Sequence, residues 1–163
     1  MEKDIAKRLN QYLGIDIGSS NLDAVRNFLV LWNQFEAKLF NCNFSASDAI
    51  NKSVTLKIND GITDNTLHYF KQRYISNGKI NNQFLRLEFR SNDNQPLVED
   101  VLFGNNKNDR DIIAAIIIII SRYRNNLFHG IKDARLSMSQ RQNFEYANDF
   151  LLTCLEWNTT NNN

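Results

Sequence analysis

The feature that most constrains the fold is a run of nine apolar residues, Ile112 to Ile120, which ends in five consecutive isoleucines. A surface helix carries one apolar stripe, so a helix that is apolar on every side must be buried on every side. The run is far shorter than the roughly 18 residues that a membrane-spanning helix needs. The sequence therefore predicts a buried helix that begins at Asp109 or Asp111 and stops at Gly130, and no membrane partner.

Two explanations account for burial on both sides of this helix. At about 100° per residue, one side can face the core of the chain, and the opposite side needs a second cover. That opposite side consists of Ala114, Ala115, Ile118, Arg122, Asn125 and His129. Because alanines allow close helix approach, Ala114, Ala115 and Ile118 are predicted to form a homodimer seam with a polar mouth. The alternative is a central helix that other helices of the same chain cover, and the sequence leaves both open.

Apolar spacing elsewhere predicts three more long helices. One spans Asn21–Phe40, one spans Ile62–Tyr74, and the last begins at Ser137 or Ser139. A single proline leaves the chain free to be mostly helical. We therefore expect an all-α bundle of four main helices in one domain, residues 1–163, with its core in 21–157.

Shorter elements surround these helices. Ile5 to Leu13 is amphipathic, and a short helix is expected after Pro96. Ser47 to Ile58 is ambiguous, whereas Phe84 to Arg90 alternates apolar and charged residues and predicts an extended segment. This segment lies in an irregular insertion at 79–104. The polar tail, residues 158–163, is expected to be disordered.

Charge and cysteine content limit the classes of function. The chain has 19 Lys and Arg against 18 Asp and Glu, which argues against a broad electrostatic grip on nucleic acid but not against a local basic site. Cys42 and Cys154 form no disulfide framework, and Met1 to Leu13 is too charged for a signal peptide, so a cytoplasmic location is expected. The cysteines and His68 and His129 lack zinc-ligand spacing, and we expect no metal or cofactor.

Polar residues follow the apolar run directly. Asn125 and His129 share a helix face, whereas Arg124 and His129 lie about 140° apart on an ideal helix. Plain structural roles exist for both charged residues: His129 near a helix C-terminus, and Arg124 in an ion pair with an acidic residue such as Glu36.

The stretch from Arg122 to Gly130 resembles the signature of HEPN domains, which is an Arg, four to six intervening residues and then a His, with a polar residue directly after the Arg. Arg124, Asn125 and His129 are the matching residues. Trp32 to Glu36 fits the aromatic first helix of that family, and His68 to Tyr74 is similar to a segment of stand-alone bacterial members. The insertion at 79–104 is longer than a minimal HEPN domain needs.

The resemblance implies a dimeric, metal-free ribonuclease in which two copies of the motif form one cleft. Histidine suits acid–base work on the RNA 2′-hydroxyl and the leaving oxygen, and a guanidinium stabilises the phosphorane. The expected products are a 2′,3′-cyclic phosphate and a 5′-hydroxyl, made by a toxin or antiphage effector with a cognate antitoxin or regulatory protein. Glu36 would support catalysis, and Arg122, Lys71 and Arg73 would contact RNA phosphates. The alternative is an inactive dimeric HEPN module that binds protein or nucleotide.

Overall fold

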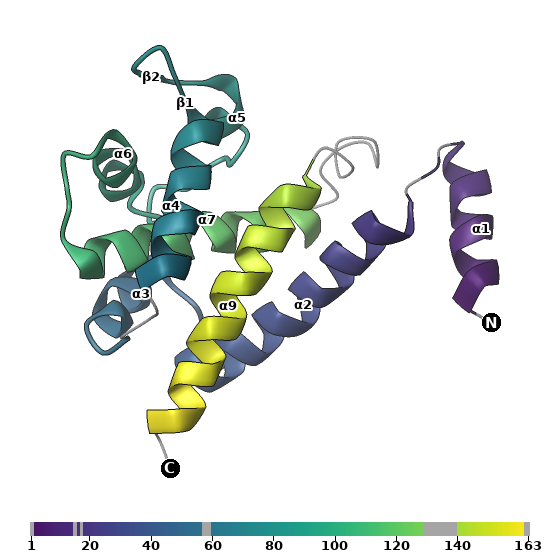
Figure 1. The fold of residues 1–163 in the computed structure, drawn as a ribbon, viewed down its shortest axis with the longest axis horizontal. Coiled ribbons are helices and arrows are strands. Elements are labelled where there is room, and N and C mark those ends of the chain that lie inside the picture. The colour runs from purple at the N-terminus through teal and green to yellow at the C-terminus, as the bar shows by residue number, and fades with distance from the viewer. Residues whose placement is uncertain (1, 15, 17, 57–59, 129–139, 162–163) are drawn as a thin grey trace.

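The computed structural model describes residues 2–14, 16, 18–56, 60–128 and 140–161, and in these it is almost entirely helical (Figure 1). The all-α prediction is therefore confirmed. The helices are α1 (Glu2–Leu13), α2 (Ser19–Phe40), α3 (Ala46–Ser53), α4 (Asp60–Tyr74), α5 (Asn82–Leu85), α6 (Gln95–Phe103), α7 (Asp109–Phe128) and α9 (Arg141–Asn161). Two short strands, β1 (Ile75–Ser76) and β2 (Lys79–Ile80), form an antiparallel hairpin.

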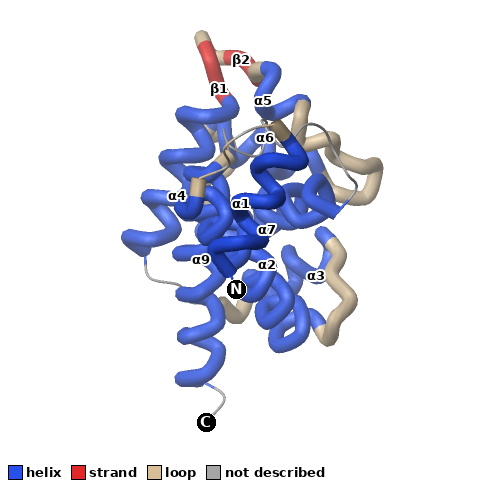
Figure 2. The backbone as a smooth tube through the Cα atoms, turned by 90° about the vertical axis from the view of Figure 1, so that its right-hand side faces the viewer, coloured by secondary structure: helices blue, strands red, loops and turns tan. Residues whose placement is uncertain are grey.

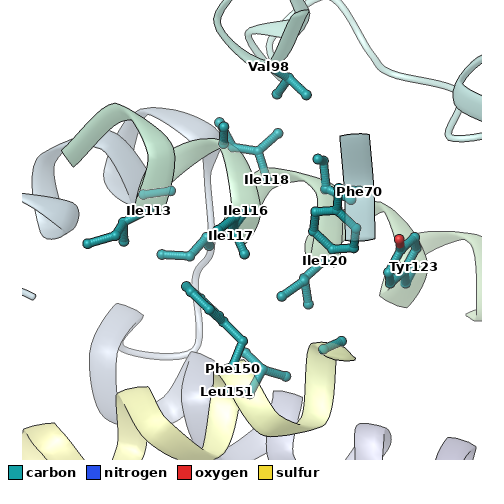
Figure 3. Packing of buried hydrophobic residues seen from close by; sticks show 14 of the residues in the cluster. Phe70, Val98, Ile113, Ile116, Ile117, Ile118, Ile120, Tyr123, Phe150 and Leu151 are labelled. Carbon is teal, nitrogen blue, oxygen red and sulfur yellow. The ribbon is translucent and has the colours of Figure 1, made fainter. Parts of the chain in front are cut away.

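Helix α7 is the centre of the bundle. Its residues from Ile113 to Ile120 are at most 6 % exposed, because α3, α4 and α6 pack on it within the same chain. Figure 3 shows Ile118 on the side of Val98 from α6, and Ile117 on the side of Phe150 from α9. Residues 113–120 of the apolar run are thus buried without a second copy, and Ile112 is partly buried.

The homodimer seam predicted along this helix is wrong. Ala114, Ala115 and Ile118 are 0 %, 1 % and 0 % exposed in a single chain. Helix α3 packs extensively on α7, and its own small side chains include Ala46 and Ala49, which are both buried. Small residues on both sides shorten the distance between helix axes. The alternative that the sequence left open, a central helix covered within its own chain, is confirmed.

Helices α2 and α9 lie side by side and form the second part of the bundle (Figures 1 and 2). The Phe28 and Phe144 rings have centroids 5.0 Å apart, and Asn148 Nδ2 donates to the carbonyl of Ala24 at 3.1 Å. Helix α2 begins after Gly18 without a side-chain cap.

The insertion at 79–104 contains helices where an extended segment was expected. Phe84 and Leu85 belong to α5, whose first turn Asn81 caps by accepting hydrogen bonds from two backbone amides. Phe84 and Leu87 are buried. Residues three apart share one side of a helical turn but lie on opposite faces of a strand. Leu85, which alternation would group with Leu87, is 62 % exposed. The expectation of an extended segment at Phe84–Arg90 is therefore wrong. The short helix after Pro96 is confirmed as α6.

The two ends of the chain differ from each other. Helix α9 continues to Asn161, with Thr159, Thr160 and Asn161 bonding to carbonyls four residues earlier. The prediction of a disordered tail is therefore wrong for residues 158–161, and 162–163 lie outside the described residues. Helix α1 stands apart from the bundle (Figure 1). Among the described helices, none is long and apolar enough to cross a membrane.

Candidate functional site

The last two turns of α7 carry the described part of the motif. Arg124 and Asn125 are half-buried, and Arg124 Nη1 donates to Asn125 Oδ1 at 3.0 Å. A guanidinium held by a neighbouring amide has a fixed plane, and that plane decides how it can bind an oxyanion. The third predicted residue, His129, lies outside the described residues. The structure thus brings together two of the three predicted catalytic residues.

Arg122 takes a different position from the predicted RNA contact. It is 3 % exposed, and its Nε and Nη2 donate to the carbonyls of Leu87 and Glu88 at 3.0 and 2.7 Å. Its Nη1 lies 3.0 Å from Asp93 Oδ2, which also accepts from the amide of Arg90. Burial lowers the pKa of Arg122, and the Asp93 carboxylate opposes that shift. The buried Arg122 side chain therefore connects α7 to residues 87–93, and the prediction that it contacts RNA phosphate is wrong.

Asn126, one turn further along α7, makes a second connection to the same segment. Its Nδ2 lies 3.2 Å from the Arg86 carbonyl and 3.4 Å from the Leu87 carbonyl. Because Asn126 and Arg122 are four residues apart, both point from the same face of the helix. Together they hold residues 86–93 against the end of α7. The sequence analysis did not predict this connection. The signal that could have indicated it is the pair of polar residues, Arg122 and Asn126, four residues apart on one helix.

Tyr123 anchors the same turn of α7 to α4. Its hydroxyl lies 2.5 Å from that of Tyr74, and both residues are at most 3 % exposed. The rings of Phe70 and Phe144 pack on Tyr123 at 6.1 Å each. Burial raises the pKa of Tyr123 and of Tyr74 well above that of a free tyrosine. The helix end that carries Arg124 is thus fixed on two sides, by α4 and by residues 86–93.

The other predicted basic residues, Lys71 and Arg73, lie on α4 and are half-buried. The Arg73 guanidinium is 5.9 Å from the centre of the Tyr74 ring. A Cβ added to Gly104 would lie 3.8 Å from Lys71 Nζ, which places this ammonium beside the C-terminal end of α6, where a cation is stabilised by the helix dipole. These contacts do not test the predicted binding of Lys71 and Arg73 to RNA phosphates, which stays a prediction.

Glu36 has structural partners as well. Its Oε2 accepts from Trp32 Nε1 at 3.2 Å, and its Oε1 accepts from the amide of Phe44 at 3.3 Å. The carboxylate therefore connects α2 to the loop that follows it. These contacts do not test the predicted supporting role of Glu36 in catalysis, which stays a prediction.

Metal ligands do not gather anywhere in the described part of the chain: no three His, Cys, Asp or Glu side chains there lie close enough to hold an ion. His68 is exposed on α4, with its Nε2 2.9 Å from Gln72 Nε2.

Comparison with protein-family models, with curated proteins and with solved structures found no match to this chain.

Proposed function

We propose that this chain is a metal-independent endoribonuclease that cleaves RNA by attack of its own 2′-hydroxyl on the adjacent phosphate. Arg124, Asn125 and His129 are the proposed catalytic residues. The observation that carries the proposal is the hydrogen bond from Arg124 to Asn125 at a half-exposed helix end. The neighbouring Arg122 is buried instead. Of the two arginines in the motif, Arg122 therefore has a structural role and Arg124 lies nearer the surface.

The proposed chemistry assigns one step to each residue. His129 moves the proton between the 2′-hydroxyl or the leaving 5′-oxygen and solvent, because imidazole titrates near neutral pH. Arg124 stabilises the added negative charge of the phosphorane through paired N–H donors. Asn125 holds the guanidinium plane. The products are a 2′,3′-cyclic phosphate and a 5′-hydroxyl, and no metal takes part.

A composite site from two copies is part of this proposal. Arg124 and His129 lie about 140° apart on an ideal helix, so the His of a second copy is better placed to meet Arg124. The copies would meet at residues 124–127, which are half-buried in one chain. They would not meet along the middle of α7, which the chain itself covers.

Cleavage in EDTA tests the proposed activity. We expect the purified protein to cut single-stranded RNA in EDTA, and Arg124→Ala or His129→Ala to lower the rate at least about 100-fold. Arg26→Ala is the matched control, because Arg26 is an exposed arginine on α2. Thermal unfolding shows whether each variant is folded. Unchanged cleavage by a highly purified His129→Ala protein would contradict the proposal.

The proposed biological role is that of a cytoplasmic toxin or antiphage effector that a cognate antitoxin or regulatory protein restrains. Expression of the wild-type chain should then arrest bacterial growth, and expression of His129→Ala to the same level should not. Equal growth arrest by both proteins would count against RNA cleavage as the cause.

A further inference from the structure

Helix α1 exposes an apolar face that its own chain does not cover. Leu9 is 37 % exposed and Tyr12 is 88 % exposed, although they share one face of an amphipathic helix. Figure 1 shows α1 standing away from the α2–α9 pair, beyond the start of α2. The Tyr12 side chain therefore buries little apolar surface within its own chain, and it is available for contact with another molecule.

The connection to α2 fixes the direction of α1. Gly14 and Gly18 have φ of +66° and +67°, a conformation that side chains with a Cβ rarely adopt. Between them, Asp16 Oδ1 accepts from Asn10 Nδ2 and from the amide of Gly18, each at 3.0 Å. These bonds brace the bend. They hold α1 away from α9, whose C-terminal half lies at the far end of the molecule (Figure 1).

The outer face of α9 also carries apolar side chains that its own chain leaves uncovered or partly covered. Leu152 is 45 % exposed, and Leu155 is half-buried in the same line. A shallow groove runs along this face, lined by Leu152, Leu155, Glu156, Thr159 and Thr160. All five residues belong to α9. The groove is therefore open to a helix from outside.

The charges of the two helices are complementary. Helix α1 carries three cations, Lys3, Lys7 and Arg8, and two carboxylates, Glu2 and Asp4, so its net charge is +1. Helix α9 carries three carboxylates, Glu145, Asp149 and Glu156, and one cation, Arg141, so its net charge is −2. Arg141 pairs with Glu145, which leaves Asp149 and Glu156 as the other acidic residues of α9. Opposite charge at the rim of an apolar contact favours encounter and fixes the register between partners.

We propose that α1 of one copy packs on the outer face of α9 in a second copy, with the Leu9 and Tyr12 side chains against Leu152 and Leu155. Arg8, at the edge of the apolar face, then lies beside Glu156. Each copy has both an arm and a groove, so two copies can exchange arms about a two-fold axis and leave neither surface open. This contact is independent of the proposed RNA cleavage and does not involve α7.

Disulfide trapping between two different proteins tests the contact directly. In a Cys42→Ser background, one protein carries Leu9→Cys and the other, with a tag of different mass, carries Leu152→Cys. Mixing and mild oxidation should give a disulfide-linked pair several-fold faster than the same experiment with Gln11→Cys. Gln11 is exposed and lies about 160° from Leu9 around α1, so it is the matched control.

The results distinguish binding of α1 to a second copy from binding of α1 to the α9 helix of its own chain. Equal trapping by Leu9→Cys and Gln11→Cys overturns the proposal. A double Leu9→Cys, Leu152→Cys chain that closes an internal disulfide and forms no linked pair also overturns it, because the arm then reaches its own α9. Tyr12→Asp, added to the Leu9→Cys protein, should lower the rate of disulfide trapping by Leu152→Cys while circular dichroism shows the same helix content. An unchanged trapping rate contradicts the contact.

Discussion

Arg122 and Asp93 form an ion pair 3.0 Å long, in which the arginine is 3 % exposed and the aspartate 13 %. The pair joins the central helix α7 to the irregular segment that follows α5. The same guanidinium also donates to two backbone carbonyls, at Leu87 and Glu88. A buried charge is tolerated only when it is paired and hydrogen-bonded in this way.

Removal of this arginine should therefore cost stability. We expect Arg122→Met to lower the free energy of unfolding by about 3 kcal/mol, because it removes the counter-charge of the Asp93 carboxylate and one donor each from the Leu87 and Glu88 carbonyls. The matched control is Arg26→Met, since Arg26 pairs with Asp23 at 3.1 Å on the surface and should cost less than about 1 kcal/mol. Urea denaturation measures both. Equal effects would contradict the structural role of Arg122.

The two buried tyrosine hydroxyls should behave as one unit. Tyr74→Phe or Tyr123→Phe leaves the other hydroxyl buried without its partner, 2.5 Å away in the wild type, and should cost about 1–3 kcal/mol. The double Phe variant removes both polar groups and should cost less than the sum of the single variants. Urea denaturation of the four proteins gives the coupling energy, and additive effects would contradict the hydrogen bond.

Alkaline pH should unfold the protein through the same pair. Burial raises the pKa of Tyr74 and Tyr123 above the ordinary value of 10.0. Above pH 10 the unfolded state loses these protons while the folded state keeps them, so stability is complete below about pH 10 and falls as the pH rises further. Unfolding at pH 8 to 11 should show this decline, and it should be shallower in the double Phe variant. Parallel curves for the two proteins would count against it.

Enlarging an alanine on α7 should distinguish a covered helix from an interface. Ala114 is 0 % exposed, so Ala114→Leu has no room and should destabilise the chain by about 1–3 kcal/mol or more. Ala37→Leu, at a half-buried position of α2, is the control and should cost less. A stable Ala114→Leu protein with an altered oligomeric state would contradict this result and support the predicted homodimer contact along α7.

Substitution of Glu36 should separate structure from catalysis. Glu36→Gln removes the charge and keeps only one acceptor oxygen, so either Trp32 Nε1 or the amide of Phe44 faces an NH2 group instead. Because the carboxylate connects α2 to the next loop, we expect stability to fall by about 1 kcal/mol. A structural role alone would leave the rate of RNA cleavage nearly unchanged. A large loss of rate in a folded Glu36→Gln protein would instead give Glu36 a supporting role in the reaction.

Local pattern was sufficient to predict the main helices. The expected Asn21–Phe40 and Ile62–Tyr74 are observed as Ser19–Phe40 and Asp60–Tyr74, because apolar spacing of three and four and stop signals such as Gly104 act within a few residues. Prediction failed at Phe84–Arg90, where one pattern of apolar positions is compatible with a strand or a helical turn. It also failed for residues 158–161, since a polar helix end keeps its internal hydrogen bonds.

The sequence by itself determined that α7 must be buried on all sides, because no single apolar stripe exists from Ile112 to Ile120. It also placed Arg122, Arg124 and Asn125 at the end of that helix. Only the tertiary structure decided what covers α7, and which arginine is buried. Those outcomes depend on partners from distant parts of the chain: α3, α4 and α6 for the middle of α7, and residues 87–93 for Arg122. A charge can enter the interior only where the fold brings acceptors to it, and spacing along one helix does not contain that information.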